Sequence, residues 1–147
     1  MRRMSFGVCV GVVLGLVLSN SLRPVAVQGQ GEKEAANRVF EMRTYVAPPG
    51  KLDGLHARFR DHTVKFLEKH GMKNVIYLSP LDKEQAKNTL VYLISHESRE
   101  AADKNWAAFK ADPGWNAAAK KSEENGKLVQ GVKAEYFAPT DYSPIKN

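Results

Sequence analysis

Hydrophobic and polar residues alternate from Val39 to Val46, a segment that reads VFEMRTYV. Alternation combined with β-branched and aromatic residues predicts a strand. From Leu52 to Leu67 the apolar residues instead recur every three or four positions, with Lys, Arg and Asp between them. This spacing predicts a helix, and the basic residues just before Gly71 are typical of a helix end.

Two apolar runs follow, NVIYLS and TLVYLIS, joined by the long connection PLDKEQAKN. They predict two adjacent antiparallel strands. Ser98 is expected to cap a second helix, in which Ala102, Trp106 and Phe109 share one face directed at the sheet. A last strand is predicted at about Val132 to Phe137, followed by an extended tail.

The stretch NWAAFKADPGW contains both tryptophans and a helix break. Asp112 precedes proline, which disfavours helical geometry, and it is placed to cap a third helix from Pro113 to Asn125. Trp115 then lies on the first turn of that helix. We expect both tryptophans to cover the sheet and the bend; in the alternative, Trp115 lines the mouth of a cavity or touches a partner subunit.

The predicted order is therefore β-α-β-β-α-β. This is the ferredoxin-like α+β arrangement, an antiparallel four-stranded sheet with its helices on one face. The other face of the sheet is left uncovered. Such a face on a small domain usually meets a ligand or a second subunit.

The N-terminal segment differs from the rest of the chain. Two arginines precede the apolar run FGVCVGVVLGLVL, which predicts a signal peptide over residues 1–29 and export to the periplasm or the medium. The run is too short for a stable membrane anchor. A polar spacer, expected to be disordered, covers residues 30–37, and the folded domain covers 38–147. Cys9 would leave with the signal, so the mature chain would have no disulfide, thiol nucleophile or cysteine-ligated metal.

Charge and motifs narrow the function further. Removal of the signal leaves 19 basic residues against 16 acidic ones, without a block of like charges, so nucleic-acid binding is not expected. The sequence has no G-x-G-x-x-G, G-x-x-x-x-G-K or G-x-S-x-G motif, and no pair of histidines at helical metal-site spacing. We therefore predict neither a metal site nor a bound cofactor.

Candidate chemistry lies on the first strand, where Glu41, Arg43 and Tyr45 share one face. The other face carries Phe40 and Met42, and this more apolar set is expected to meet the helices. Glu41, Arg43 and Tyr45 would then point into the space between two subunits. They form either a site for an anionic or carbonyl ligand or an ion-pair ladder that only fixes the sheet register.

His62 lies on the predicted buried stripe of the first helix, three residues after Phe59 and four before Phe66. A hydrogen-bonded structural histidine is the favoured interpretation. A general base or a haem contact is the alternative.

The segments FEMRTYVAPPGKLDGL, VYLISHES, WAAFKADPGW and APTDYSPI give the chain from Val39 onward a resemblance to the NIPSNAP family. Such domains are similar to dimeric α+β barrels, in which two ferredoxin-like sheets face each other inside a ring of helices. That group includes cofactor-free monooxygenases, isomerases and haem-binding members, and the NIPSNAP branch has no settled reaction. The signal peptide differs from the better-known members, which are mitochondrial.

The resemblance implies a homodimer with a small-molecule site in the cavity between the sheets. Two alternatives stay open, a cofactor-free monooxygenase or isomerase and a non-catalytic interaction module, so enzymatic activity is undecided. The candidate cavity-lining residues are Glu41, Arg43, Tyr45, His62 and Trp115.

Overall fold

The structure is a computed structural model that describes residues 38–145 of the 147-residue chain. The predicted signal peptide and spacer lie outside the described residues. A four-stranded antiparallel sheet and the helices on it make up the described part, which confirms the predicted fold class. Its elements are β1 (Val39–Val46), α2 (Leu52–Arg58), the π-helical turn η1 (Phe59–Thr63), α3 (Val64–Lys69), β2 (Lys73–Leu78), the 3₁₀ turn η2 (Gln85–Lys87), β3 (Thr89–His96), α4 (Arg99–Ala111), α5 (Pro113–Ser122) and β4 (Gly131–Phe137).

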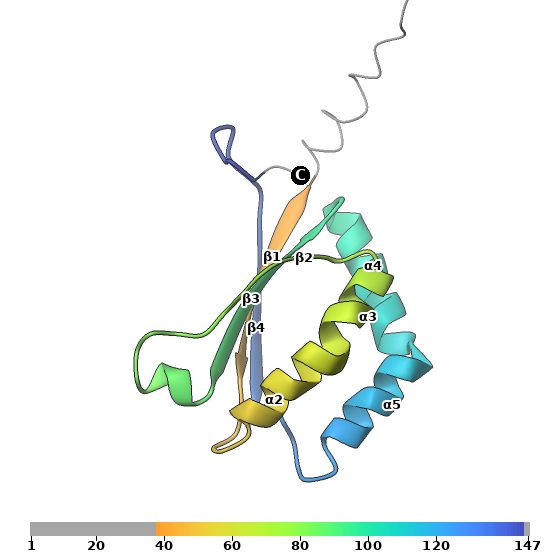
Figure 1. Ribbon diagram of the computed structural model, residues 1–147. Coiled ribbons are helices and arrows are strands. Elements are labelled where there is room, and N and C mark those ends of the chain that lie inside the picture. Colours follow the sequence, from red (N-terminus) through yellow and green to blue (C-terminus); the bar gives the residue numbers. More distant parts are fainter. Residues whose placement is uncertain (1–37, 146–147) are drawn as a thin grey trace, which may run out of the picture.

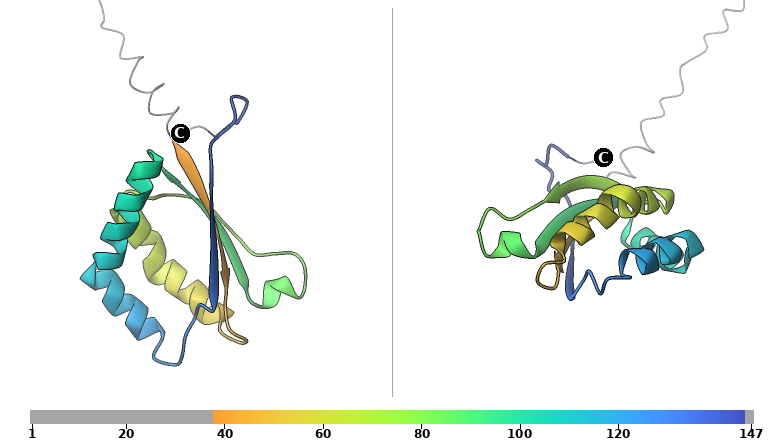
Figure 2. Two further views of the ribbon diagram at one scale, coloured as in Figure 1. Left: turned by 180° about the vertical axis from the view of Figure 1, so that it is seen from behind. Right: turned by 60° about the horizontal axis from the view of Figure 1, so that its bottom comes forward.

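The strands lie in the order β2-β3-β1-β4, so β1 is central and pairs with β3 on one side and β4 on the other. Helices α2 to α5 all lie on one side of this sheet (Figures 1 and 2). The connection between β2 and β3 contains η2 and projects beyond the sheet (Figure 1). None of the helices within residues 38–145 is both long and apolar enough to span a membrane.

The predicted helix boundaries at Ser98 and Asp112 are confirmed. The Ser98 hydroxyl accepts a hydrogen bond from the amide of Ala101 at 3.1 Å and so caps α4. Asp112 accepts from the amides of Gly114 at 2.8 Å and Trp115 at 3.2 Å and caps α5. The third helix ends at Ser122, three residues earlier than predicted.

One feature of the first helix was not predicted. The α-helical pattern is interrupted by the π-helical turn from Phe59 to Thr63, where the Thr63 hydroxyl donates to the carbonyl of Arg58 at 3.3 Å. The extra residue in this turn shifts the faces presented by the residues after it. Gly71, with a φ of +74°, then ends the helix in left-handed geometry.

Packing between the sheet and the helices confirms the predicted face of α4. Trp106 is only 9% exposed, and Phe109 and Ala102 on the same face are buried as well. The centre of the core is aromatic. Edge-to-face and stacked ring contacts, with centroids 5.2 to 5.8 Å apart, join Tyr45, Phe59, Tyr77 and Tyr92.

The prediction of which face of β1 meets the helices is wrong. Glu41 is fully buried beneath α4, where it accepts a hydrogen bond from the Trp106 indole. Phe40 and Met42 lie on the uncovered side and line a surface groove there. The prediction ranked the faces by hydrophobicity alone. Glu41 can be buried because Arg43 on the same strand and His96 and Trp106 on other elements bind its oxygens.

Candidate functional site

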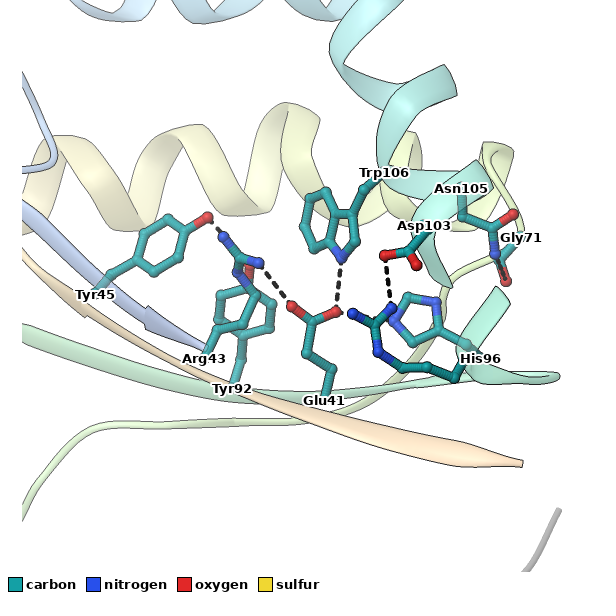
Figure 3. A network of polar contacts seen from close by, with 10 residues as sticks. Glu41, Arg43, Tyr45, Gly71, Tyr92, His96, Asp103, Asn105 and Trp106 are labelled. Atoms are coloured by element: carbon teal, nitrogen blue, oxygen red, sulfur yellow. Dashed lines mark hydrogen bonds and ion pairs between the residues drawn. The ribbon is translucent and has the colours of Figure 1, made fainter. Parts of the chain in front are cut away.

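Three donors converge on the carboxylate of Glu41 at the centre of the sheet. Arg43 donates from Nη1 to Oε1 at 2.7 Å, and Trp106 donates from Nε1 to Oε2 at 2.6 Å. His96 Nε2 lies 2.9 Å from Oε2. Figure 3 shows Glu41, Arg43 and Tyr45 extending from β1 toward the helix that carries Trp106. We call Glu41, Arg43, His96 and Trp106 the Glu41 cluster.

The cluster keeps Glu41 ionised. Burial alone would raise the pKa of this carboxyl group, but hydrogen bonds from His96, Trp106 and Arg43 outweigh burial and hold the pKa below its ordinary value. A carboxylate with a lowered pKa and occupied acceptor sites is a poor general base. Glu41 therefore serves to position and neutralise the groups around it.

Arg43 is the group of the cluster with donors to spare. Its guanidinium lies 4.3 Å from the centre of the Trp106 ring and 5.5 Å from that of Tyr45. Only Nη1 donates within the described part of the chain, and the buried Nε has no acceptor. Burial would lower the pKa of Arg43, but Tyr45, Tyr92 and Glu41 outweigh it and raise this pKa, so the side chain stays charged.

The tyrosines beside Arg43 carry a second polar contact. The Tyr92 hydroxyl donates to that of Tyr45 at 3.2 Å. Burial first, and then the neighbouring Tyr45, raise the pKa of Tyr92 well above its ordinary value, so its hydroxyl remains protonated. The Tyr45 hydroxyl thus lies at the margin of the core, with Arg43 next to it.

On the helix-facing side of the sheet, the helices do not cover the part of β4 next to Arg43. In the antiparallel pairing of β1 with β4, Ala134 lies opposite Arg43 and Val132 lies opposite Tyr45, so all four side chains share the helix-facing side. Ala134 and Val132 are nevertheless exposed, Val132 to 46%. A small molecule could therefore lie on β4 and reach Arg43 from that side.

His96 also belongs to this site, although it was not among the candidate residues predicted from the sequence. It is fully buried, and its Nδ1 has no partner in the described part of the chain. It pairs with Val39 across β1 and β3, which places it on the same side as Glu41. Prediction of this register between β1 and β3 would have placed His96 next to Glu41.

Two candidate residues lie elsewhere. His62 lines a groove of about 470 Å³ between the first helix and α5, together with residues such as Arg58 and Lys121. Trp115 packs on Phe109, with ring centres 4.5 Å apart, in the layer of helices. The structure thus groups Glu41, Arg43 and Tyr45 and separates both His62 and Trp115 from them.

Two further hollows mark the surface. One, of about 290 Å³, lies between the first helix and the end of β2. The other, of about 530 Å³, is the groove on the uncovered side of the sheet, and the tail after β4 forms part of its wall. Its lining residues are Phe40, Met42, Leu93, Phe137, Pro139, Ser143, Pro144 and Ile145. Within residues 38–145, no three His, Cys, Asp or Glu side chains gather in a way that could hold a metal ion.

Comparison with known proteins identifies a family match and solved structures with a similar fold. The NIPSNAP family profile matches residues 40–144, which is more than half of the chain. An uncharacterized NIPSNAP-like domain protein from Burkholderia xenovorans has a TM-score of 0.65 at 18% identity, over 76% of this chain and 93% of that one. A NIPSNAP family protein of unknown function from Agrobacterium tumefaciens has a TM-score of 0.63 at 20% identity, over 74% and 94%.

A more distant structure with the same fold has a stated activity. SnoaB from Streptomyces nogalater, a cofactor-independent oxygenase, has a TM-score of 0.53 at 17% identity, over 75% of this chain and all of its own. At these identities the likeness shows the fold alone. No curated protein matches the sequence.

Proposed function

The chain belongs to the NIPSNAP family, and on this premise we propose that it is an exported homodimer that binds a small anionic molecule at Arg43. The observation that carries the proposal is the state of the Arg43 guanidinium. It is charged, 84% of the side chain is removed from solvent, and it donates a single hydrogen bond within the described residues. A mostly buried arginine with a free donor binds carboxylates and other planar anions well.

The surroundings of Arg43 favour such a ligand. Trp106 and Tyr45 hold the guanidinium from two sides, so little side-chain entropy remains to be lost on binding. The exposed Ala134 and Val132 supply an apolar surface beside it. An anion with a small hydrocarbon or aromatic part would fit this combination of charge and apolar wall.

The site proposed here lies within each protomer. In a dimer closed through the uncovered sheet faces, the cavity between the sheets would be lined by Phe40, Met42 and Leu93 rather than by Glu41 and Arg43. We call this uncovered side the open face. Its apolar side chains, including Phe137 at 45% exposure, support a second copy of the chain as its partner.

Catalysis by a cofactor-free oxygenase or isomerase is the second candidate, supported by the shared fold of SnoaB. Such a reaction requires a base that removes a proton from the substrate. Glu41 has its acceptor sites occupied, and His96, with a free Nδ1, is fully buried. The geometry therefore supports binding better than proton abstraction.

Native mass spectrometry of protein purified from its own compartment tests the proposal. We expect a dimer carrying a small adduct, and we expect Arg43→Gln to lose the adduct while remaining dimeric. Arg99→Gln is the matched control. Arg99 is also paired with a carboxylate, Asp103 at 2.6 Å, and stacked on an aromatic ring, Tyr136 at 4.0 Å, but it is 47% exposed.

An adduct retained by Arg43→Gln, or lost equally in Arg99→Gln, would contradict binding at Arg43. Loss of the dimer in Arg43→Gln would instead identify Arg43 as an interface residue. Oxygen consumption measured with the released adduct as substrate would distinguish an oxygenase from a binding protein.

A further inference from the structure

We propose that the chain has a second ligand site, a pocket for small aromatic or branched-chain monocarboxylates between the first helix and the end of β2. This pocket has a volume of about 290 Å³, and none of its lining residues belongs to the Arg43 site. We call it the β2 pocket. It is lined by His56, Phe59, Arg60, Val64, Tyr77, Leu78, Ser79 and Leu90.

The walls of the β2 pocket are mainly hydrocarbon. Phe59 and Leu90 form its buried part, at 4% and 2% exposure, and they belong to the core of the fold. Val64 on the first helix and Tyr77 on β2 add to this apolar lining. Burial of an apolar group against these side chains would stabilise a complex in proportion to the area removed from water.

The mouth of the pocket carries two polar groups that can meet a carboxylate. His56 and Arg60 are four residues apart on the first helix and both line the pocket. Within residues 38–145, neither side chain has a hydrogen bond or an ion pair. Arg60 is exposed, and no acidic side chain is among the residues that line the pocket.

The β2 pocket lies at a π-helical turn, which Phe59 and Arg60 begin. Phe59 packs against the Tyr77 ring, with ring centres 5.8 Å apart, while its neighbour Arg60 lies at the surface. Single π-helical turns frequently occur at binding sites.

The size of the pocket selects the ligand. Ligand sites commonly have volumes of roughly 300–1,000 Å³, so the β2 pocket is at the lower limit. It would hold one phenyl ring or a short branched chain, with the carboxylate at Arg60, and it is too small for a haem or a flavin. Phenylacetate and 4-methylvalerate are suitable probes.

Isothermal titration calorimetry with the intact mature protein tests the proposal. We expect saturable binding of phenylacetate and 4-methylvalerate, with Kd on the order of 0.1–1 mM for ligands of this size. Phenylacetamide, which has the same shape without the charge, should bind more weakly. Arg60→Gln should weaken phenylacetate binding in the β2 pocket about five- to tenfold, and Ser79→Phe should abolish binding in this pocket by filling its mouth.

Arg60 and Ser79 are exposed, so these changes leave the core intact. Lys65→Gln is the matched control, because it removes one positive charge from the same helix outside the pocket and should not alter binding. Absence of saturable binding, equal affinity for phenylacetamide, or an equal effect of Lys65→Gln would overturn the proposal. Loss of phenylacetate binding in Arg43→Gln but not in Arg60→Gln would place the ligand at Arg43 and also overturn it.

Discussion

Replacing Glu41 by glutamine tests the Glu41 cluster as a structural unit. The amide has nearly the shape of the carboxylate but no charge, and only its oxygen accepts hydrogen bonds. If that oxygen faces Trp106 and His96, the amide N–H groups face the Arg43 guanidinium, so two donors oppose each other. Arg43 then keeps its charge beside Trp106 without a counter-ion.

The expected loss of stability in Glu41→Gln follows from the burial of the ion pair. Removal of one partner from a buried ion pair costs about 3–5 kcal/mol. Glu41 is fully buried, but 16% of the Arg43 side chain remains exposed, so water can solvate part of the uncompensated charge. We therefore expect Glu41→Gln to lower the free energy of unfolding by about 2–4 kcal/mol and the Tm by about 8–16 °C.

Urea denaturation followed by far-UV circular dichroism would measure this change. Glu84→Gln is the control, because Glu84 also pairs with a base, Lys87 at 2.6 Å, but is 79% exposed. That change should stay within about 0.5 kcal/mol of wild type. A Glu41→Gln protein as stable as the Glu84→Gln protein would refute the cluster as a stabilising unit.

The pH dependence of the same pair gives a second measurement. The pKa of Glu41 is lowered in the folded state, so its stabilising contribution is present above the ordinary value of 4.5 and is lost as the pH falls through the lower folded pKa. The stability difference between wild type and Glu41→Gln should be complete at pH 7 and narrow below about pH 4.5. A constant difference across this range would contradict the assignment of an ionised Glu41.

Three further predictions concern the helix junction, the open face and export. Asp112→Ala removes the cap of α5 and the partner of Lys69 and His70, so circular dichroism should show a lower Tm and less helix; an unchanged melting curve would contradict the capping role. Phe137→Asp adds a charge to the open face, and light scattering should show the dimer dissociate into folded monomers, whereas a persistent dimer would exclude this face as the interface. Intact-mass measurement of the exported protein should show a chain that starts between about Leu22 and Gly31, and a full-length chain in the cytoplasm would contradict export.

Local sequence signals predicted much of the fold. Alternation over Val39–Val46 gave the central strand with its observed bounds, and the capping positions Ser98 and Asp112 are confirmed by their hydrogen bonds. The buried face of α4 at Trp106 is confirmed as well. Each of these signals depends on residues within a few positions of one another, so it can be detected in a single sequence.

The site itself depends on long-range pairing and was only partly predicted. Glu41, Arg43 and Tyr45 were recognised as one group because they alternate along one strand. Trp106 and His96 complete the cluster from positions 65 and 55 residues away, so their contacts with Glu41 depend on the register and packing of other elements. Without those partners Glu41 was predicted on the wrong side of the sheet.

The predicted position of His62 was also wrong, because the π-helical turn was not predicted. The prediction placed His62 on the buried stripe by extending a regular α-helical period through Phe59. The inserted residue of the π turn rotates the following side chains, and His62 instead lines the groove toward α5. No local signal in the segment FRDHT marks this insertion.

A crystal structure of the protein isolated with its ligand retained would test the central claim most directly. We predict an anion within hydrogen-bond distance of Nη2 of Arg43, on the side of the exposed Val132 and Ala134, in each protomer of a dimer closed through the open faces. A ligand bound between the two sheets, against Phe40 and Met42, would contradict the account, as would an Arg43 whose remaining donors are occupied by the protein's own groups.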